Sequence, residues 1–305
     1  VSVTADGKVK FTEKGEFAAK FKKPLTSSKL SAMHVQAVFS GSDARLMCFT
    51  DMGNCVYIDL EDQDPSDYRA APLSLHEICP DAIESERAVK LFTREELRGD
   101  VLFFTRQGMI KRTPWAEYSL NKGYYQAIKL KEGDEVIGVE TYDTDEFSTL
   151  FFVSRSGLAL NAVKDDVPVQ GRVAGGVRGM ALAGGDECIF ATQINGEGEI
   201  VVVTAAGGFK RVISSLIDPI GRNCKGVIIA DVKDCRRLLF ADYVTIPYTL
   251  AVINSDGSVA ELNTEDISIE NRVTKGKKLK HNPPLDPVRV VALKHKRDES
   301  IPHKF

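Results

Sequence analysis

Residues 100–113 read Asp-Val-Leu-Phe-Phe-Thr-Arg-Gln-Gly-Met-Ile-Lys-Arg-Thr, and this stretch is the clearest indication of the fold. The apolar run at 101–104 is typical of a strand that is buried on both faces. Gly108 stands where a tight turn needs a positive φ, and residues 109–113 return as a second strand. The stretch therefore predicts an antiparallel hairpin.

The same pattern recurs along the chain. Six times an apolar run ends in Thr, Ser or Asn, and a glycine follows three residues later, at successive spacings of 46, 55, 49, 50 and 50 residues. A strand-rich repeat of about 50 residues indicates a propeller with one small antiparallel sheet per repeat. We expect an all-β fold of six four-stranded blades in a single domain, residues 1–293. The turn glycines are Gly7, Gly53, Gly108, Gly157, Gly207 and Gly257.

The third repeat also predicts where the other two strands of a blade lie. We expect a third strand at 127–130 and, after the turn at Gly133, a fourth at 135–140. The segment 294–305 is charged and contains a proline, so we expect a disordered tail there.

Composition describes an ordinary globular protein, with 43% hydrophobic and 27% charged residues among 305. No apolar run approaches the ~18 residues of a membrane helix, and no signal peptide precedes the first repeat, so we expect a cytoplasmic protein without membrane partners. The six cysteines form no Cys-x-x-Cys pair and are interpreted as reduced thiols. Since Val1 already lies in an apparent strand, we expect a fragment of a longer protein.

No catalytic constellation is visible. The five histidines lack metal-ligand spacing, no serine or cysteine has a recognisable general base beside it, and the turn glycines are interpreted as structural. The sequence therefore predicts no catalytic residue, no metal and no cofactor. Trp115 and Tyr118 are expected to fill gaps between blades, although they also suit a surface rim.

Several motifs together point to one family. They are the Thr-x-x-Gly turns, Lys-Arg after the turn, Glu117-Tyr118, Glu-Gly-Asp-Glu-Val-Ile-Gly-Val at 132–139 and Gly-Gly-Val-Arg-Gly-Met at 175–180. In this combination the whole chain resembles the C-terminal domain of the A subunit of bacterial type IIA topoisomerases, DNA gyrase and topoisomerase IV. The resemblance implies a six-bladed β-pinwheel whose basic rim binds and bends double-stranded DNA without cleaving it. It also implies two partners, the ATPase B subunit together with the rest of the A subunit, in a bacterial, nucleoid-associated location.

The sub-type depends on one stretch of the first repeat. The resemblance to gyrase implies a box there with glutamine, paired arginines and paired glycines, which serves chiral wrapping of DNA. Residues 16–24 read Glu-Phe-Ala-Ala-Lys-Phe-Lys-Lys-Pro, which is basic but lacks those residues. The sequence therefore favours a topoisomerase IV-like domain.

The candidate DNA contacts are cations, because affinity for the phosphate backbone comes from clustered Lys and Arg. Lys10, Lys111-Arg112 and Lys210-Arg211 follow the turn glycines of repeats one, three and five, and equivalent positions on successive blades are expected to form an arc on one surface. An alternative is that they are solvated strand edges that discourage edge pairing. The segment 275–280 suits either a further phosphate site or a solvated loop, and the loop is favoured. Loop cations that extend the arc are Lys20, Lys22, Lys23, Lys122, Arg172, Arg178, Arg222 and Lys225.

A second function stays open from the sequence alone. The formal net charge is -3, and acidic loops occur at 61–67 and 143–146. These features suit a propeller that serves as a scaffold for protein–protein interaction. An enzyme with a site at the hub is disfavoured, because no His, Asp or Glu recurs at matching blade positions.

Overall fold

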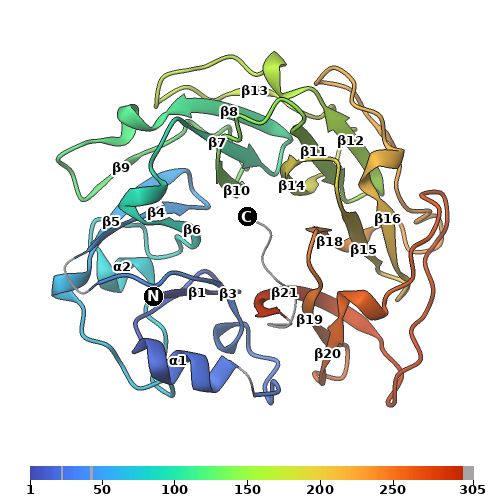
Figure 1. The fold of residues 1–305 in the computed structure, drawn as a ribbon, viewed down its shortest axis with the longest axis horizontal. Helices are drawn as coiled ribbons and strands as arrows, with labels where there is room; N and C mark the ends of the chain where they lie inside the picture. The colour runs from blue at the N-terminus through green and yellow to red at the C-terminus, as the bar shows by residue number, and fades with distance from the viewer. Residues whose placement is uncertain (22, 42–43, 298–305) are drawn as a thin grey trace.

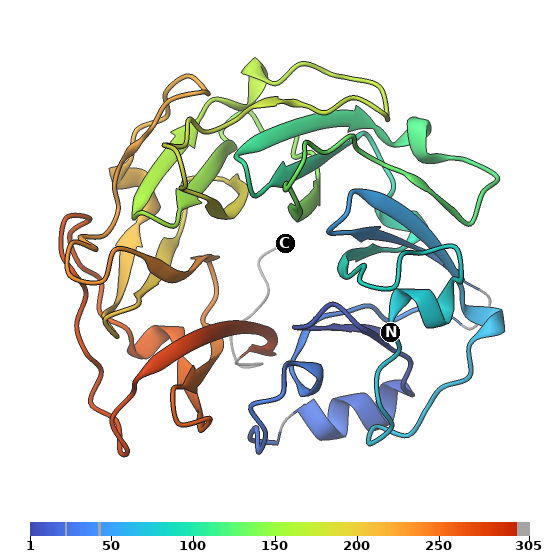
Figure 2. The same ribbon diagram turned by 180° about the vertical axis from the view of Figure 1, so that it is seen from behind.

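The computed structural model describes residues 1–21, 23–41 and 44–297 of the chain. These residues form six antiparallel sheets that stand around a central space like the blades of a propeller (Figures 1 and 2). The expected all-β, propeller-like fold is confirmed. In the described part of the chain three sheets have four strands and three have three strands, whereas four had been predicted for each.

The sheets are called blades 1 to 6 in chain order. Blade 1 contains β2 (Val9–Lys10), β1 (Ser2–Thr4) and β3 (His34–Ala37). Blade 2 contains β6 (Ala88–Phe92), β4 (Arg45–Thr50), β5 (Asn54–Asp59) and β9 (Tyr124–Gln126). Blade 3 contains β10 (Val136–Thr141), β7 (Asp100–Thr105), β8 (Met109–Pro114) and β13 (Val177–Arg178).

Blades 4 to 6 repeat this order. Blade 4 contains β14 (Cys188–Ile194), β11 (Thr149–Ser154), β12 (Leu158–Ala162) and β17 (Val227–Ile228). Blade 5 contains β16 (Phe209–Ile213), β15 (Glu199–Thr204) and β18 (Leu238–Val244). Blade 6 contains β20 (Val259–Asn263), β19 (Tyr248–Asn254) and β21 (Pro287–Arg297).

Helices are short and lie outside the sheets. The α-helices are α1 (Lys14–Phe21) and α2 (Leu75–Ile78). The 3₁₀ helices are η1 (Leu30–Ala32), η2 (Leu60–Asp62), η3 (Arg94–Glu96), η4 (Trp115–Tyr118), η5 (Lys164–Asp166), η6 (Ser214–Leu216) and η7 (Thr264–Asp266). Helix α1 occupies most of the basic stretch at 16–24.

The outermost strand of blades 2, 3 and 4 comes from the following repeat. Tyr125 of β9 pairs with Cys55 of β5. Strand β13 pairs with β8, and β17 pairs with β12, in the same antiparallel way. The predicted strand at 127–130 is therefore wrong in its bounds, since the observed strand is Tyr124–Gln126. The fourth predicted strand is confirmed as β10, with its bounds shifted by one residue at each end.

Glycine permits this exchange because the donated segment and the strand that receives it come very close. Gly226 precedes β17 with φ of +79°, and a Cβ there would lie 2.0 Å from the carbonyl oxygen of Ala159 on β12. Gly176 holds the same place before β13, with φ of +80° and a gap of 2.4 Å to the oxygen of Ile110. Each site needs a left-handed backbone and leaves no space for a side chain.

Aromatic residues fill the space between blades 2 and 3. The rings of Phe49 and Tyr118 meet edge to face at 5.5 Å, and Trp115 packs against Phe92 at 5.1 Å. Trp115 and Tyr118 are buried, which confirms that they fill a gap between blades.

Blades 1 and 6 also share a core. Met33 packs with Ile253 of β19 and Leu293 of β21, so the first and last blades are in contact. Strand β21 runs to Arg297, so residues 294–297 belong to a sheet and the expectation of a tail there is wrong. The remainder of the predicted tail, 298–305, lies outside the described residues.

Replacing Gly226 by alanine should destabilise the fold by more than the ~1–3 kcal/mol of a left-handed non-glycine residue, since the Cβ also meets the backbone of β12. Chemical denaturation measures the change in unfolding free energy. Gly133→Ala is the matched control, because Gly133 has φ of +71° but open space around the added Cβ. Equal losses in the two variants would contradict the close approach.

Candidate nucleic-acid interface

The lysines that follow the turns of blades 1, 3 and 5 are buried. Lys10, Lys111 and Lys210 are 3%, 0% and 1% exposed. A fully enclosed ammonium group cannot reach a phosphate on the surface. The expectation that these three lysines form a surface arc for DNA is therefore wrong, and so is its alternative, that they are solvated strand edges.

Oxygen atoms of the next repeat enclose the ammonium groups of Lys10 and Lys210, whereas Lys111 has two acceptors in its own repeat and one in the next. Lys10 donates to Oγ of Ser66 at 3.1 Å and to the carbonyl oxygens of Asp67 and Ala70 at 2.8 and 2.6 Å. A buried charge that satisfies all its hydrogen bonds avoids most of the penalty of leaving water. Lys10 therefore fastens the loop of repeat two to blade 1.

Lys111 and Lys210 act in the same way. Lys111 donates to the hydroxyl of Tyr118 and to the carbonyl oxygens of Ala127, at 2.8 Å, and Arg172. Lys210 donates to the carbonyl oxygens of residues 271, 272 and 274, at 2.8 to 3.0 Å. Lysine thus staples blade 1 to repeat two, blade 3 to repeat four and blade 5 to repeat six. The matching residues of blades 2, 4 and 6 are Val56, Leu160 and Ala260.

The arginines beside two of these lysines have internal partners. Arg112 pairs with Asp100 at 2.5 Å and lies over the ring of Tyr142, and Arg211 pairs with Glu199 at 2.5 Å. Their side chains are 22% and 13% exposed. Neither guanidinium is exposed to solvent in the way that a DNA-binding arc on the surface requires.

The other cations gather on the segments that supply the outer strands. We define the outer-edge belt as residues 119–131, 168–182, 219–230 and 268–280, which contain twelve Lys and Arg and one acidic residue, Glu270. Three of these segments carry β9, β13 and β17, which lie on the outside of the ring (Figure 1). The fourth pairs Lys277 with Phe209 of β16. Within these segments cations therefore outnumber acids, although the chain has a net charge of -3 and Glu132, Asp218 and Asp231 directly adjoin them.

Three arginines occupy equivalent places in the belt. Nη1 of Arg222 donates to the carbonyl oxygen of Arg178 on β13 at 3.1 Å, and Nη1 of Arg272 donates to that of Ile228 on β17 at 3.2 Å. Arg172 donates likewise to the carbonyl oxygen of Gln126 on β9. Each guanidinium is half-buried and fixed by the preceding outer strand, which leaves its remaining N–H groups on the rim.

The structure places the remaining predicted residues as follows. Lys122, Arg178 and Lys225 are exposed members of the belt. Lys20 lies in α1 with its ammonium group 5.8 Å from the ring of Tyr68, and Lys23 follows the helix, so these two cations belong to blade 1 and not to the belt. Lys22 lies outside the described residues.

Sequence reasoning missed several belt residues. Arg272 repeats Arg172 and Arg222 at an interval of 50 residues, which was a usable signal. Lys277 and Lys278 stand where β17 has Val227 and Ile228, so the loop at 275–280 continues the outer edge. Lys275 pairs with Asp234 at 2.5 Å. Lys129 and Lys131 follow β9 and are exposed.

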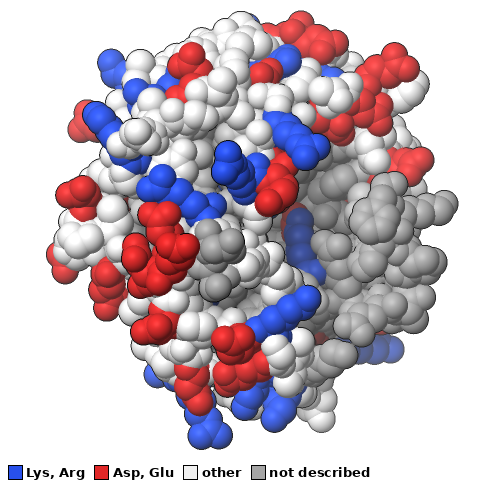
Figure 3. Space-filling model, turned by 60° about the vertical axis from the view of Figure 1, so that its left-hand side comes forward, with Lys and Arg blue, Asp and Glu red and all other residues white. Residues whose placement is uncertain are grey.

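Blade 1 has the opposite charge at its outer edge. The segment 61–73 reaches β2 through a pairing of Leu73 with Val9, and it carries four acidic residues against the single cation Arg69. The side of the molecule that carries α2, β5 and β9 shows Lys and Arg interleaved with Asp and Glu (Figure 3). The outer edge of blade 1 is thus acidic, and charge is mixed on the side of the molecule that includes the edge of blade 2.

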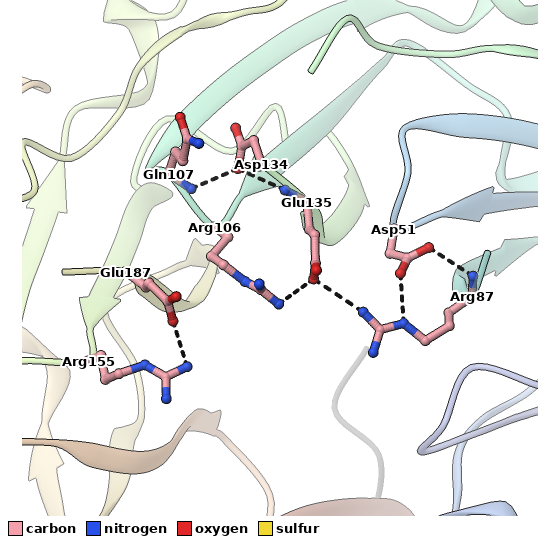
Figure 4. A network of polar contacts seen from close by, with 8 residues as sticks. All are labelled: Asp51, Arg87, Arg106, Gln107, Asp134, Glu135, Arg155 and Glu187. Atoms are coloured by element: carbon pink, nitrogen blue, oxygen red, sulfur yellow. Dashed lines mark hydrogen bonds and ion pairs between the residues drawn. The ribbon is translucent and has the colours of Figure 1, made fainter. Parts of the chain in front are cut away.

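A separate polar network lies at the hub (Figure 4). Arg87 pairs with Asp51 at 2.7 Å and with Glu135 at 3.2 Å, and Arg106 pairs with the same carboxylate of Glu135. Asp51, Arg87 and Glu135 line a central cavity of about 340 Å³. These pairs join blades 2 and 3 and leave little uncompensated charge between them.

No helix among the described residues is long and apolar enough to span a bilayer. Within the same part of the chain, no three His, Cys, Asp or Glu side chains are grouped to hold a metal ion.

Comparisons with known proteins agree with this architecture. Residues 99–143, 148–195 and 198–238 match the family model of the DNA gyrase C-terminal domain, a β-propeller. The A subunit of DNA gyrase from Klebsiella oxytoca is 28% identical over 234 residues, which are 76% of this chain and 26% of that protein. The A subunit of DNA topoisomerase 4 from Bacillus subtilis is 28% identical over 284 residues, which are 90% of this chain and 34% of that protein. The chain thus spans about a quarter to a third of the curated relatives it matches.

Solved structures show the same fold. The C-terminal domain of DNA topoisomerase IV superimposes with a TM-score of 0.82 at 24% identity, over 97% of this chain and 93% of that one. The DNA gyrase A C-terminal domain gives 0.68 at 19% identity, over 96% and 97% of the two chains.

Replacing Lys111 by methionine should lower the unfolding free energy by about 1–3 kcal/mol, because buried oxygen acceptors lose their donor. Urea denaturation measures this loss. Lys122→Met, at an exposed belt position, is the control and should change stability little. A stable Lys111→Met variant would show that the staple is dispensable.

The cost of Lys111→Met should also depend on pH. Burial, followed by the charge of Arg172, lowers the pKa of Lys111 to about 7. Between pH 7 and the unfolded value near ~10.4, the unfolded chain keeps a proton that the folded chain releases, so wild-type stability rises with pH by up to about 1.4 kcal/mol per unit. The stability deficit of Lys111→Met should therefore grow from pH 7 to pH 10. A deficit that shrinks over this range would mean that the oxygen cage raises the pKa instead.

Proposed function

Because the chain is a homologue of the C-terminal β-propeller domains of DNA gyrase and topoisomerase IV A subunits, we propose that it binds and bends duplex DNA along its outer edge. The observation that carries this proposal is the outer-edge belt. Its four segments hold twelve cations and one acid, although the whole chain is acidic. Clustered cations bind the phosphate backbone and release counterions, whatever the base sequence.

The belt suits bending because its cations are distributed over successive blades. Arg172, Arg222 and Arg272 repeat at the same place on a curved edge, and each is oriented by a carbonyl oxygen. A duplex that contacts several of them has to follow the curve, and phosphate contacts along the bend offset the cost of deforming the DNA. We propose that the path of the DNA along the outer edge ends at the acidic edge of blade 1.

The module would act as part of a larger enzyme. The curated relatives are longer topoisomerase A subunits, and the matched residues cover only 26% and 34% of two of them. We propose that its partners are the ATPase B subunit together with the rest of the A subunit, in the bacterial cytoplasm. In that assembly the module positions DNA for strand passage, whereas DNA cleavage and ATP hydrolysis belong to the other parts.

The finer proposal is a topoisomerase IV-like role. The stretch at 16–24 lacks the glutamine, arginines and paired glycines of the gyrase box, and helix α1 covers residues 14–21. Blade 1 also presents acids at its edge. Both features favour bending over chiral wrapping.

The scaffold alternative keeps one supporting feature. The segment 61–73 carries four acids at the edge of blade 1 and suits a basic protein partner. Nuclease-treated pull-downs separate the two functions, because a protein recovered in fixed ratio without DNA supports the scaffold.

The triple variant Lys122→Ala, Arg178→Ala, Lys225→Ala should bind DNA more weakly and with a flatter salt dependence. The slope of log K against log salt should fall by about 0.9 for each phosphate that the variant no longer neutralises. Fluorescence anisotropy with a labelled duplex measures both quantities. The control replaces Lys29, Arg94 and Arg98, which are exposed cations outside the belt. Equal weakening by the two triple variants would contradict the belt assignment.

The topoisomerase IV-like assignment predicts little change in DNA linking number. Nicked circles that are sealed by ligase in the presence of the chain should show nearly the same topoisomers as circles sealed without it. A large shift of one sign, growing with protein concentration, would instead reveal gyrase-like wrapping.

A further inference from the structure

The hub repeats one backbone arrangement in every blade. The residue after Thr, Ser or Asn in each turn donates its N–H to the residue just before the inner strand of the same blade. In blade 4 Arg155 donates to Glu187 at 2.7 Å, and in blade 5 Ala205 donates to Arg237 at 3.1 Å. Equivalent side chains of the blades can therefore be compared directly.

In blades 2, 3 and 4 these two positions carry opposite charges. The pairs are Asp51 with Arg87, Arg106 with Glu135 and Arg155 with Glu187. Blade 5 breaks the pattern. Its turn carries Ala205 opposite Arg237, so the turn supplies no acid to pair with this arginine. Arg237 is exposed.

Because of this change, an arginine of blade 5 follows an arginine of blade 4 across the interface between the two blades. The N–H of Leu238 donates to the carbonyl oxygen of Arg155 at 2.7 Å, so Arg237 stands beside Arg155. The same bond between blades 3 and 4, from Cys188 to Arg106, places Glu187 beside an arginine. The acid that follows Arg106 across one interface is thus replaced by an arginine after Arg155 across the next.

Arg236 adds a third cation. Asp134 and Asp186 hold this position in blades 3 and 4, and their carboxylates accept the N–H groups of the turns. Arg236 instead has φ of 62°, a left-handed conformation that costs a non-glycine residue free energy. A strained backbone that presents a cation in place of an acid suggests a functional demand.

The acids near Arg236 and Arg237 have other partners, and one of them, Glu187, pairs with Arg155 itself. Glu187 pairs with Nη2 of Arg155 at 2.6 Å, Asp186 accepts from Ser156, and Asp234 pairs with Lys275. Among the described residues no carboxylate pairs with Arg236 or Arg237. Within the same part of the chain, Nε of Arg155 is buried and has no hydrogen-bond partner.

We propose that Arg155, Arg236 and Arg237 form a phosphate-binding site on the hub, between blades 4 and 5. Guanidinium groups match the geometry of phosphate oxygens, and a dianion would neutralise Arg236 and Arg237, with which no carboxylate pairs in the described part of the chain. The phosphate comes from a DNA segment or from a free polyphosphate, and only the first source rests on the proposed DNA-binding function. The site is separate from the outer-edge belt.

Calorimetric titration of the whole chain with pyrophosphate at low salt tests the site. Wild type should show saturable binding, and Arg237→Glu, which restores the charge found in blades 3 and 4, should weaken it about tenfold or more. Lys225→Ala, in the belt, should bind pyrophosphate like wild type. Absence of saturable binding to wild type, or equal affinity in Arg237→Glu, would overturn the proposal.

Two further measurements complement this test. Arg236→Ala should also weaken pyrophosphate binding, and both variants should keep the thermal midpoint of wild type because the two side chains are exposed. Adding Arg237→Glu to the Lys122, Arg178, Lys225 triple variant identifies the source of the phosphate. A further loss of duplex binding indicates DNA, and an unchanged residual affinity indicates a free polyphosphate. The pyrophosphate titration does not depend on whether the belt binds DNA, so failure of the hub site and failure of the proposed function are distinguishable.

Discussion

The exchange of outer strands between successive repeats is the constraint on which the rest of the structure depends. Blades 2, 3 and 4 are completed by β9, β13 and β17, which come from the next repeat. These strands are only two or three residues long, so few ladder hydrogen bonds hold them. Close approach at Gly176 and Gly226, and buried lysine staples in alternate blades, supply the remaining attachment.

This constraint also sets the charge distribution. A donated segment has one side against the neighbouring blade and the other toward solvent. Lys111 and Lys210 turn inward and bind carbonyl oxygens, whereas Arg178 and Lys225 turn outward on the segments that the exchange places at the edge. The same exchange therefore builds the ring and concentrates positive charge on its outer edge, in a chain that is acidic as a whole.

The repeat and its turns were readable from the sequence because tight hairpins require glycine at fixed spacing. Strand β7 matches its predicted bounds for that reason. The outer strands were misplaced, since two-residue strands carry no periodicity and their partners lie in another repeat. The lysine assignment failed although a signal was present: Val56, Leu160 and Ala260 occupy the same position in the other blades and mark it as interior. Helix α1 and the hub arginines depend on tertiary packing, which local propensity does not report.

Binding of the unmodified chain to a labelled duplex of about 40 base pairs, titrated over a series of salt concentrations, tests most directly whether the outer edge binds DNA through phosphates. We expect sequence-independent binding whose log affinity falls linearly and steeply with log salt. Absence of binding at low salt, or binding that salt does not weaken, would contradict this expectation.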